Sequence, residues 1–221
     1  MENHLRIIGD IHGERNVYLD YLQGVEYTIQ IGDLDFDYEF LLDVSPDNHR
    51  VLAGNHDNYD QVSKFSHFLG DFGVHEVPEF GEIFFVRGGW SIDYKARSSI
   101  GTRRRKKDLW EEEELTIQQC YEAYDLYQKV KPKFLISHEA PLSVVSMVTN
   151  PQVTQNLGFG SVVKTKTNQL LQIMHDFHAP KIHVFGHYHC SFDREIDNTR
   201  FVCVDALKYI NFERDFMLKL E

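Results

Sequence analysis

The chain has 221 residues, of which 42% are hydrophobic and 13% aromatic, so it is long enough to bury a large core and is not of the disordered class. Its net charge of −11 argues against broad nonspecific binding to nucleic acid or anionic membranes, but not against an acidic site that holds cations. No apolar run approaches the length of a membrane-spanning segment, so we expect no membrane partner.

The cysteines and the first residues bear on location and domain organisation. Cys120, Cys190 and Cys203 show no close-pair spacing, which is typical of reduced thiols in a cytoplasmic protein. The first residues run directly into a predicted strand, so we expect no signal peptide. We predict a single domain over residues 1–221, with residues 91–108 as a candidate lid or insert.

Three apolar runs in the first quarter of the chain each predict a strand that ends in glycine and polar side chains. They lead into Gly9-Asp10-Ile11-His12, Gly32-Asp33 and Gly54-Asn55-His56-Asp57. Helical spacing over residues 14–23 predicts a helix after the first block. Each block taken alone is also compatible with a helix cap, a surface histidine or a simple turn.

The second half of the chain repeats this design. Residues 134–136 lead into Ser137-His138, and residues 182–185 lead into Gly186-His187-Tyr188-His189. Before both blocks we predict a helix over residues 109–130, with Ile117, Tyr121 and Tyr124 on one face. Between the two blocks we predict a polar loop over residues 143–161. Phe201, Cys203, Phe216, Leu218 and Leu220 alternate with other residues near the C-terminus and predict closing strands.

Strands that alternate with helices indicate an α/β layered fold, in which ligands collect outside the carboxyl ends of the strands. All five polar blocks lie at such ends, so we expect their side chains to form one site. The candidate metal ligands are Asp10, His12, Asp33, Asn55, His138, His187 and His189. This set includes no thiolate, which argues against a structural cysteine–zinc site.

Seven ligands are too many for one tetrahedral ion and suit two ions that share a carboxylate. The mixed nitrogen and oxygen donors are compatible with Mn²⁺, Fe, Zn²⁺ or Ni²⁺ and do not choose among them. We expect Mn²⁺, with Fe, Zn²⁺, Ni²⁺ or Mg²⁺ as alternatives. Two such ions, about 3.5–4 Å apart, activate a bridging water and hold two oxygens of a phosphoryl group. Hydrolysis of a phosphate ester is therefore the reaction that the set predicts.

Taken together and in this order, the five blocks resemble the calcineurin-like metallophosphoesterase family, and the resemblance spans residues 10–189. It implies a two-sheet β-sandwich flanked by helices, with a dimetal site at the C-terminal ends of the strands. It further implies one ion held by Asp10, His12 and His189, a second held by Asn55, His138 and His187, and Asp33 as the bridging ligand.

The resemblance also implies roles in the reaction. The nucleophile is a hydroxide that bridges the ions. His56 resembles the catalytic histidine of the family, which donates a proton to the leaving oxygen or neutralises charge on the phosphate. Asp57 would orient the His56 ring, as a carboxylate orients histidine in other acid–base pairs.

The chain departs from the serine/threonine protein phosphatase branch of this family, in which Asp-Arg-Gly follows the second aspartate. Here Asp33 is followed by Leu34-Asp35-Phe36-Asp37, so the phosphate-binding arginine is absent at that place. Arg97 is a candidate substitute, and a solvated loop arginine is the alternative interpretation.

Three functions remain open at this point. The first is a phosphoesterase on small phosphomonoesters or phosphodiesters, nucleotides included. The second is a phosphodiesterase or nuclease on cyclic or oligonucleotides, suggested by the basic run Arg103–Lys107, although such runs are more often solvated loops. The third is a non-catalytic interaction module on the same fold. The sequence leaves the oligomeric state open.

Overall fold

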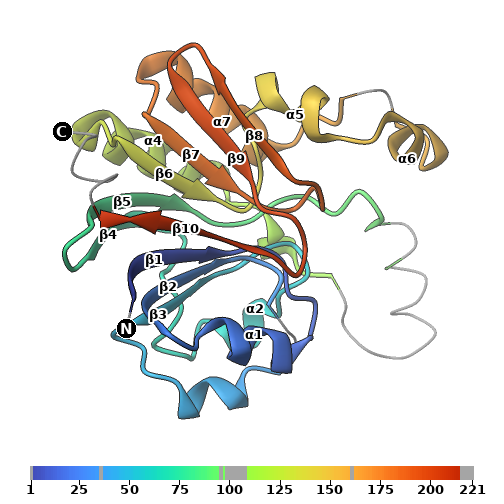
Figure 1. Cartoon of the computed structure of the whole chain (residues 1–221). Coiled ribbons are helices and arrows are strands. Elements are labelled where there is room, and N and C mark those ends of the chain that lie inside the picture. The colour runs from blue at the N-terminus through green and yellow to red at the C-terminus, as the bar shows by residue number, and fades with distance from the viewer. Residues whose placement is uncertain (1, 35–36, 95–96, 98–108, 160–161, 215–221) are drawn as a thin grey trace.

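Two β-sheets lie face to face, with helices over the outer face of each sheet (Figure 1). The structure is a computed structural model that describes residues 2–34, 37–94, 97, 109–159 and 162–214. The predicted two-sheet α/β architecture is confirmed. Among the described residues, no helix has both the length and the apolar character needed to cross a membrane.

The first sheet has the strand order β10-β1-β2-β3. Its three parallel strands are β1 (Glu2–Ile8), β2 (Val25–Ile31) and β3 (His49–Leu52), and β10 (Tyr209–Glu213) pairs antiparallel with β1. The outer face is covered by α1 (Arg15–Tyr21), α2 (Tyr59–Val62) and the 3₁₀ segment η1 (Glu39–Asp43). Because β1, β2 and β3 run in the same direction, their carboxyl ends lie at one edge of the sheet.

The second sheet has the strand order β4-β5-β6-β7-β9-β8. Its strands are β4 (Phe72–Val77), β5 (Gly81–Val86), β6 (Phe134–Ser137), β7 (Ile182–Phe185), β8 (Phe192–Ile196) and β9 (Thr199–Cys203). Strands β5, β6, β7 and β9 are parallel. The helical segments of this half are η2 (Glu111–Glu113), α4 (Ile117–Val130), α5 (Leu142–Val148), α6 (Pro151–Asn156) and α7 (Lys166–Phe177).

The core follows from alternation along the strands, because successive side chains point to opposite faces of a sheet. Ile7 packs between the two sheets, whereas its neighbour Ile8 packs under α1. In the second sheet Ile136 faces the first sheet, whereas Leu135 packs against α4 and α7. Burial on both faces leaves little freedom in where each strand ends, and this positions the loops that follow.

Two of the predicted local features differ from the structure, and two others lie wholly or mostly outside the described residues. The segment 143–161 holds the helices α5 and α6 rather than a polar loop, because Asn150 caps α6, Pro151 opens it and Val145 anchors α5. The helix predicted over residues 109–130 begins only at Ile117, where Thr116 caps it, and the 3₁₀ segment η2 precedes it. Ile117 and Tyr121 of α4 are exposed, and its fully buried side chains are Ala123 and Tyr127. The predicted strand at Phe216, Leu218 and Leu220 lies outside the described residues, as does most of the candidate lid at 91–108.

Candidate metal centre

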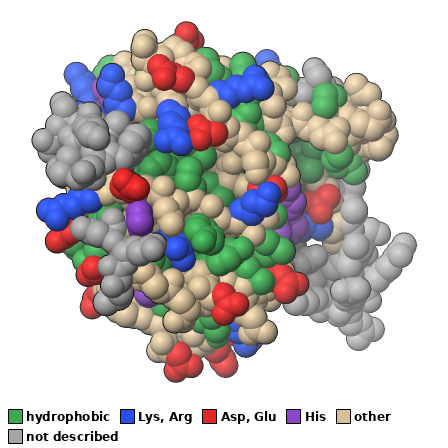
Figure 2. Space-filling view, viewed as in Figure 1, with side chains coloured by type: hydrophobic (Ala, Val, Ile, Leu, Met, Phe, Trp, Pro, Cys, Tyr) green, Lys and Arg blue, Asp and Glu red, His purple; other side chains and the backbone are tan. Residues whose placement is uncertain are grey.

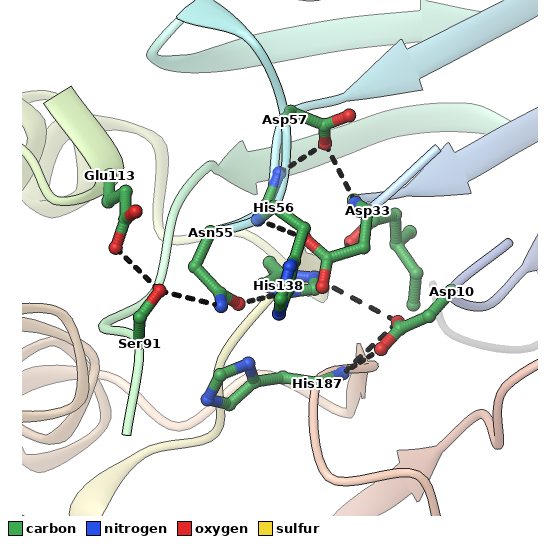
Figure 3. A network of polar contacts seen from close by, with 12 residues as sticks. Asp10, Asp33, Asn55, His56, Asp57, Ser91, Glu113, His138 and His187 are labelled. Carbon is green, nitrogen blue, oxygen red and sulfur yellow. Dashed lines mark hydrogen bonds and ion pairs between the residues drawn. The ribbon is translucent and has the colours of Figure 1, made fainter. Parts of the chain in front are cut away.

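Five strand ends, three from the first sheet and two from the second, bring the predicted site residues to one edge of the molecule (Figure 3). Backbone hydrogen bonds tie these ends together within each sheet. The N–H groups of Ile11 and His12 donate to the Asp33 carbonyl, each at 2.9 Å, and the N–H of Gly186 donates to the His138 carbonyl at 3.0 Å. The loops that carry the polar side chains are therefore fixed relative to one another.

One group of converging donors consists of Asp10, His12 and His189. The Nε2 atoms of His12 and His189 are 2.9 Å apart, and His189 Nε2 is 3.0 Å from Asp10 Oδ2. The three ligand atoms all lie within 4.8 Å of one another. Asp10 is fully buried, while the two imidazoles border solvent, so this group is open on one side.

A second group is fully buried and consists of Asp10, Asp33 and His138. His138 Nδ1 lies 2.9 Å from the Ile31 carbonyl oxygen, which can only accept a hydrogen bond. In the neutral ring the lone pair is therefore on Nε2, which lies 3.0 Å from Asn55 Oδ1 and 3.5 Å from Asp33 Oδ1. This is the arrangement in which a histidine commonly binds a metal ion, with its other ring nitrogen held by a backbone carbonyl.

His187 occupies a different position from the other predicted ligands. Its backbone N–H donates to both carboxylate oxygens of Asp10 at 3.2 Å, while its ring extends away from Asp10 (Figure 3). The ring lies 5.0 Å from that of His138, centroid to centroid. Burial, and then the charge of His138, lowers the pKa of His187 to about 3, so its imidazole is neutral.

The electrostatics of the site favour a cation between the carboxylates. Burial alone would lower the pKa of His138, but the charge of Asp33 and the hydrogen bond to it outweigh this and raise the pKa to about 10. The same interaction holds the pKa of Asp33 below its usual range despite complete burial. Buried carboxylates that face amide oxygen and imidazole nitrogen are a suitable donor set for a divalent transition ion. The residues present therefore fit the predicted metal ions.

The backbone at these positions adopts a conformation that non-glycine residues rarely take. His12, Asp33, His187 and His189 have φ values of 48°, 58°, 69° and 48°. Strained backbone of this kind clusters at functional sites, where it aims side chains at a common point. Glycine is needed beside them, because a Cβ at Gly186 would overlap Asp10 Oδ1.

Comparison with known proteins identifies the family. The profile of the calcineurin-like phosphoesterases matches residues 4–191. The chain belongs to the calcineurin-like phosphoesterase family. It is therefore a hydrolase of phosphate esters, and the family implies a dimetal site, for which the two groups of donors are the candidates.

Comparison with solved structures finds similar proteins of low sequence identity. The phosphopantetheinyl hydrolase of Mycobacterium tuberculosis is 16% identical, with a TM-score of 0.51 over 93% of this chain and 90% of that one. A Thermotoga maritima protein is 14% identical, with a TM-score of 0.42 over 96% of this chain and 91% of that one. No curated protein sequence matches the chain.

Within this phosphoesterase, His56 lies beside the open group of donors. Its ring is perpendicular to that of His12, with the centroids 5.2 Å apart, and its backbone N–H donates to Asp33 Oδ1 at 2.8 Å. Burial lowers the pKa of His56 below its usual range, and the negative charge of Asp33 opposes this.

The sequence suggested that Asp57 contacts the His56 ring, but in the structure Asp57 has other partners. Its carboxylate accepts hydrogen bonds from the backbone N–H groups of Asp33, Leu34 and Gly54, at 2.7, 3.1 and 2.8 Å, and from the Tyr38 hydroxyl at 2.7 Å. Within the part of the chain that the structure describes, the His56 ring is not among these partners. Asp57 thus braces the loops after β2 and β3 instead of orienting the imidazole.

A buried polar cluster behind Asn55 was not predicted from the sequence. Asn55 Nδ2 donates to Ser91 Oγ at 3.0 Å, and Ser91 Oγ donates to Glu113 Oε2 at 2.7 Å (Figure 3). Because the amide nitrogen is held on this side, the Asn55 oxygen faces His138 and the carboxylates. The sequence signal for this cluster was the glycine pair Gly88-Gly89, just before Ser91, because paired glycines indicate a tight approach of two backbone segments. In the structure Gly88 has φ 88°, and a Cβ added there would overlap the Glu113 carbonyl.

Arg97 belongs to the same cluster and is not a solvated loop arginine. It is 4% exposed, and its guanidinium donates to the Asn55 carbonyl at 3.2 Å and to Ser91 Oγ. It also forms an ion pair with Glu113 at 3.3 Å. Arg97 therefore holds the Asn55 loop from behind.

Proposed function

We propose that this chain is a dimetal-dependent phosphoesterase that hydrolyses small phosphate monoesters or diesters. The observation that carries the proposal is the convergence of two buried carboxylates with an amide oxygen and imidazoles from five strand ends. Such a set has no evident structural purpose of its own, since buried carboxylates are costly unless a cation compensates them.

In this proposal Asp10, His12 and His189 hold one ion, Asn55, His138 and His187 hold the other, and Asp33 is shared. The first set is supported by the contacts of His189 with His12 at 2.9 Å and with Asp10 at 3.0 Å. The second set is supported by the contact of His138 with Asn55 at 3.0 Å. Mn²⁺ is the proposed ion, and Fe, Zn²⁺, Ni²⁺ or Mg²⁺ would also suit the mixed oxygen and nitrogen donors. When bound, two divalent ions activate water as a nucleophile and stabilise charge on the phosphoryl oxygens.

The residues of the chain supply the remaining parts of the reaction. His56 borders the cavity beside the metal centre and is the proposed proton donor to the leaving oxygen. Its position is set by the hydrogen bond from its own N–H to Asp33. Asp57 keeps the loops of Asp33 and His56 together, and Ser91 keeps the amide oxygen of Asn55 turned toward the ions.

Two features from the sequence stay outside this proposal. The basic run Arg103–Lys107, which suggested oligonucleotide substrates, lies outside the described residues. The cytoplasmic location expected from cysteine usage stays a prediction.

The proposal is tested by measuring hydrolysis of 4-nitrophenyl phosphate and bis(4-nitrophenyl) phosphate after dialysis against a chelator and reloading with Mn²⁺, Zn²⁺, Fe²⁺, Ni²⁺ or Mg²⁺. We expect turnover of at least one ester that depends on added metal and is abolished by the chelator. His56→Ala should lower the rate while metal content stays that of the unaltered protein. Absence of turnover with every metal would overturn the proposal.

A further inference from the structure

A cavity of about 490 Å³ opens directly beside the candidate metal centre. One of its walls is formed by Asp33, Asn55, His56, His187 and His189. Its volume falls in the range of about 300–1,000 Å³ that is common for small-molecule sites. A substrate whose phosphoryl group lies at the metal centre would therefore place the rest of the molecule in this cavity.

The wall opposite the metal centre is mostly apolar. It includes Trp90, Val145 of α5, Val153 of α6 and Leu157, which directly follows α6. Trp90 is supported from behind by Phe159, whose ring lies edge-on to it at 5.4 Å. Figure 2 shows hydrophobic side chains at the surface close to the histidines, in the region of α5 and α6.

Two of these apolar side chains are unusually open to solvent for their type. Val153 is 48% exposed and Leu157 is 37% exposed. Burying such surface against an apolar group is favourable, at about 25 cal/mol per Å². A hydrophobic ring in the cavity would cover both side chains and lie against Trp90.

The charges around the cavity argue against an anionic occupant. Among the described residues that line it, the ionisable side chains are carboxyl groups, imidazoles and the phenol of Tyr188, and none is a lysine or an arginine. Asp93 adds a carboxylate beyond the predicted metal ligands. Burial raises the pKa of Glu139 to about 8, so this second added carboxyl group is largely uncharged near neutral pH. A second phosphate or a carboxylate on the substrate would approach these groups without a cation to pair with.

Resting on the proposed function, we propose that this cavity binds the leaving group of the substrate, and that this group is an uncharged, ring-bearing, mainly apolar alcohol. The enzyme then prefers phosphate esters of aryl-like alcohols over esters of small or anionic alcohols. The apolar side chains supply affinity, and the lack of lysine and arginine among the described lining residues supplies the discrimination against negative charge.

The proposal is tested with phosphonates, which bind like phosphate esters but are not hydrolysed. Isothermal titration calorimetry on the Mn²⁺-loaded protein compares methylphosphonate, benzylphosphonate and 4-carboxybenzylphosphonate. We expect benzylphosphonate to bind at least about tenfold more tightly than methylphosphonate, as burial of an apolar ring predicts. The carboxylated probe should lose most of that gain.

A gain of binding provides a second readout. Leu157→Lys places a cation at the apolar wall, at a half-exposed position where the fold tolerates it. The variant should bind 4-carboxybenzylphosphonate more tightly than benzylphosphonate, which reverses the order of the unaltered protein. Ile173→Lys is the matched control, since Ile173 on α7 is 51% exposed and does not line the cavity.

Two results would overturn this inference: affinities for the three phosphonates that agree within about twofold, or an unchanged order of the two aryl probes in Leu157→Lys. Because these measurements need no turnover, they are separate from the test of the proposed function. If the enzyme hydrolysed phosphate esters without any preference for an aryl group, the proposed function would be supported and only the inference about the leaving group would be wrong.

Discussion

The two sides of the cavity are built in different ways. On the metal side, each polar group is held by others: Asp33 Oδ1 accepts the His56 N–H, and Asn55 is held by Ser91 and Arg97. On the opposite side, Val153 and Leu157 come from or follow a short helix and are exposed and apolar. The difference suggests that the strand ends fix the chemistry, whereas the segment around α5 and α6 determines which leaving group is accepted.

The largest expected effect is on the metal side, at the shared carboxylate. Asp33→Asn removes one charge from a ligand of both proposed ions, and we expect kcat to fall by at least about 10³-fold. Asp37→Asn is the matched control, because Asp37 is an exposed acid of the same loop that pairs with Arg15. Steady-state kinetics with 4-nitrophenyl phosphate measures both. More than a tenth of the activity remaining in Asp33→Asn would contradict the shared-ligand role.

The second prediction separates bracing from catalysis. Asp57→Ala leaves three backbone N–H groups and the Tyr38 hydroxyl without their acceptor, so the free energy of unfolding should fall by about 3 kcal/mol. His56→Ala should lower kcat with little change in stability. Urea unfolding of both variants measures this. Equal stability of the two variants would instead favour the original expectation, in which Asp57 acts through the His56 ring.

The third prediction concerns the support behind Asn55. Ser91→Ala removes the acceptor for Asn55 Nδ2 and the hydroxyl that Glu113 binds. Loss of such supporting contacts commonly costs about tenfold to a hundredfold in metal affinity or activity. Activity titrated with Mn²⁺ should therefore need a higher metal concentration, with Ser45→Ala, at an exposed position, as the control. An unchanged Mn²⁺ dependence would show that Asn55 needs no such support.

The smallest effect is expected at a histidine pair outside the metal centre. His175 Nε2 lies 2.9 Å from His183 Nδ1, and His183 Nε2 lies 2.7 Å from Ser137 Oγ. Burial lowers the pKa of His175 to about 4. Below pH 6.5 the unfolded chain takes up a proton that the folded protein does not, so stability falls as the pH drops from 6.5 to 4.

His175→Gln keeps a polar side chain at this position but removes the imidazole that takes up the proton. Urea unfolding of the metal-free proteins at pH 6.5 and pH 4 measures this. Between these pH values the free energy of unfolding of the variant should fall by about 1–2 kcal/mol less than that of the unaltered protein. Identical pH dependence in the two proteins would show that the buried pair titrates normally.

The sequence predicted which strand ends meet at one edge because each element there carries a local signal, whereas metal binding by these residues stays a prediction. An apolar run, a glycine and a polar residue identify a strand end, and parallel strands bring such ends together. Positions such as Asp10, Asp33 and His138 therefore needed no knowledge of the tertiary structure. Their left-handed backbone could not be read from residue type, since it depends on how the loops pack.

The other side of the cavity was missed for the opposite reason. The segment 143–161 is mixed in composition, and α5 and α6 form through tertiary packing of Val144, Val145 and Val148 with a capping asparagine. The partners of Asp57 and Arg97 were likewise beyond sequence patterns, because the contacts span 24 residues to Asp33 and 42 residues to Asn55. Nothing local distinguishes a bracing carboxylate from an orienting one.

The central claim is that groups from five strand ends bind two cations through a shared Asp33. Metal content after equilibrium dialysis against Mn²⁺, measured by inductively coupled plasma mass spectrometry, tests it most directly. We predict about two ions per chain in the unaltered protein and about one or fewer in Asp33→Asn. Fewer than about one ion in the unaltered protein, or the same content in the variant, would contradict the account.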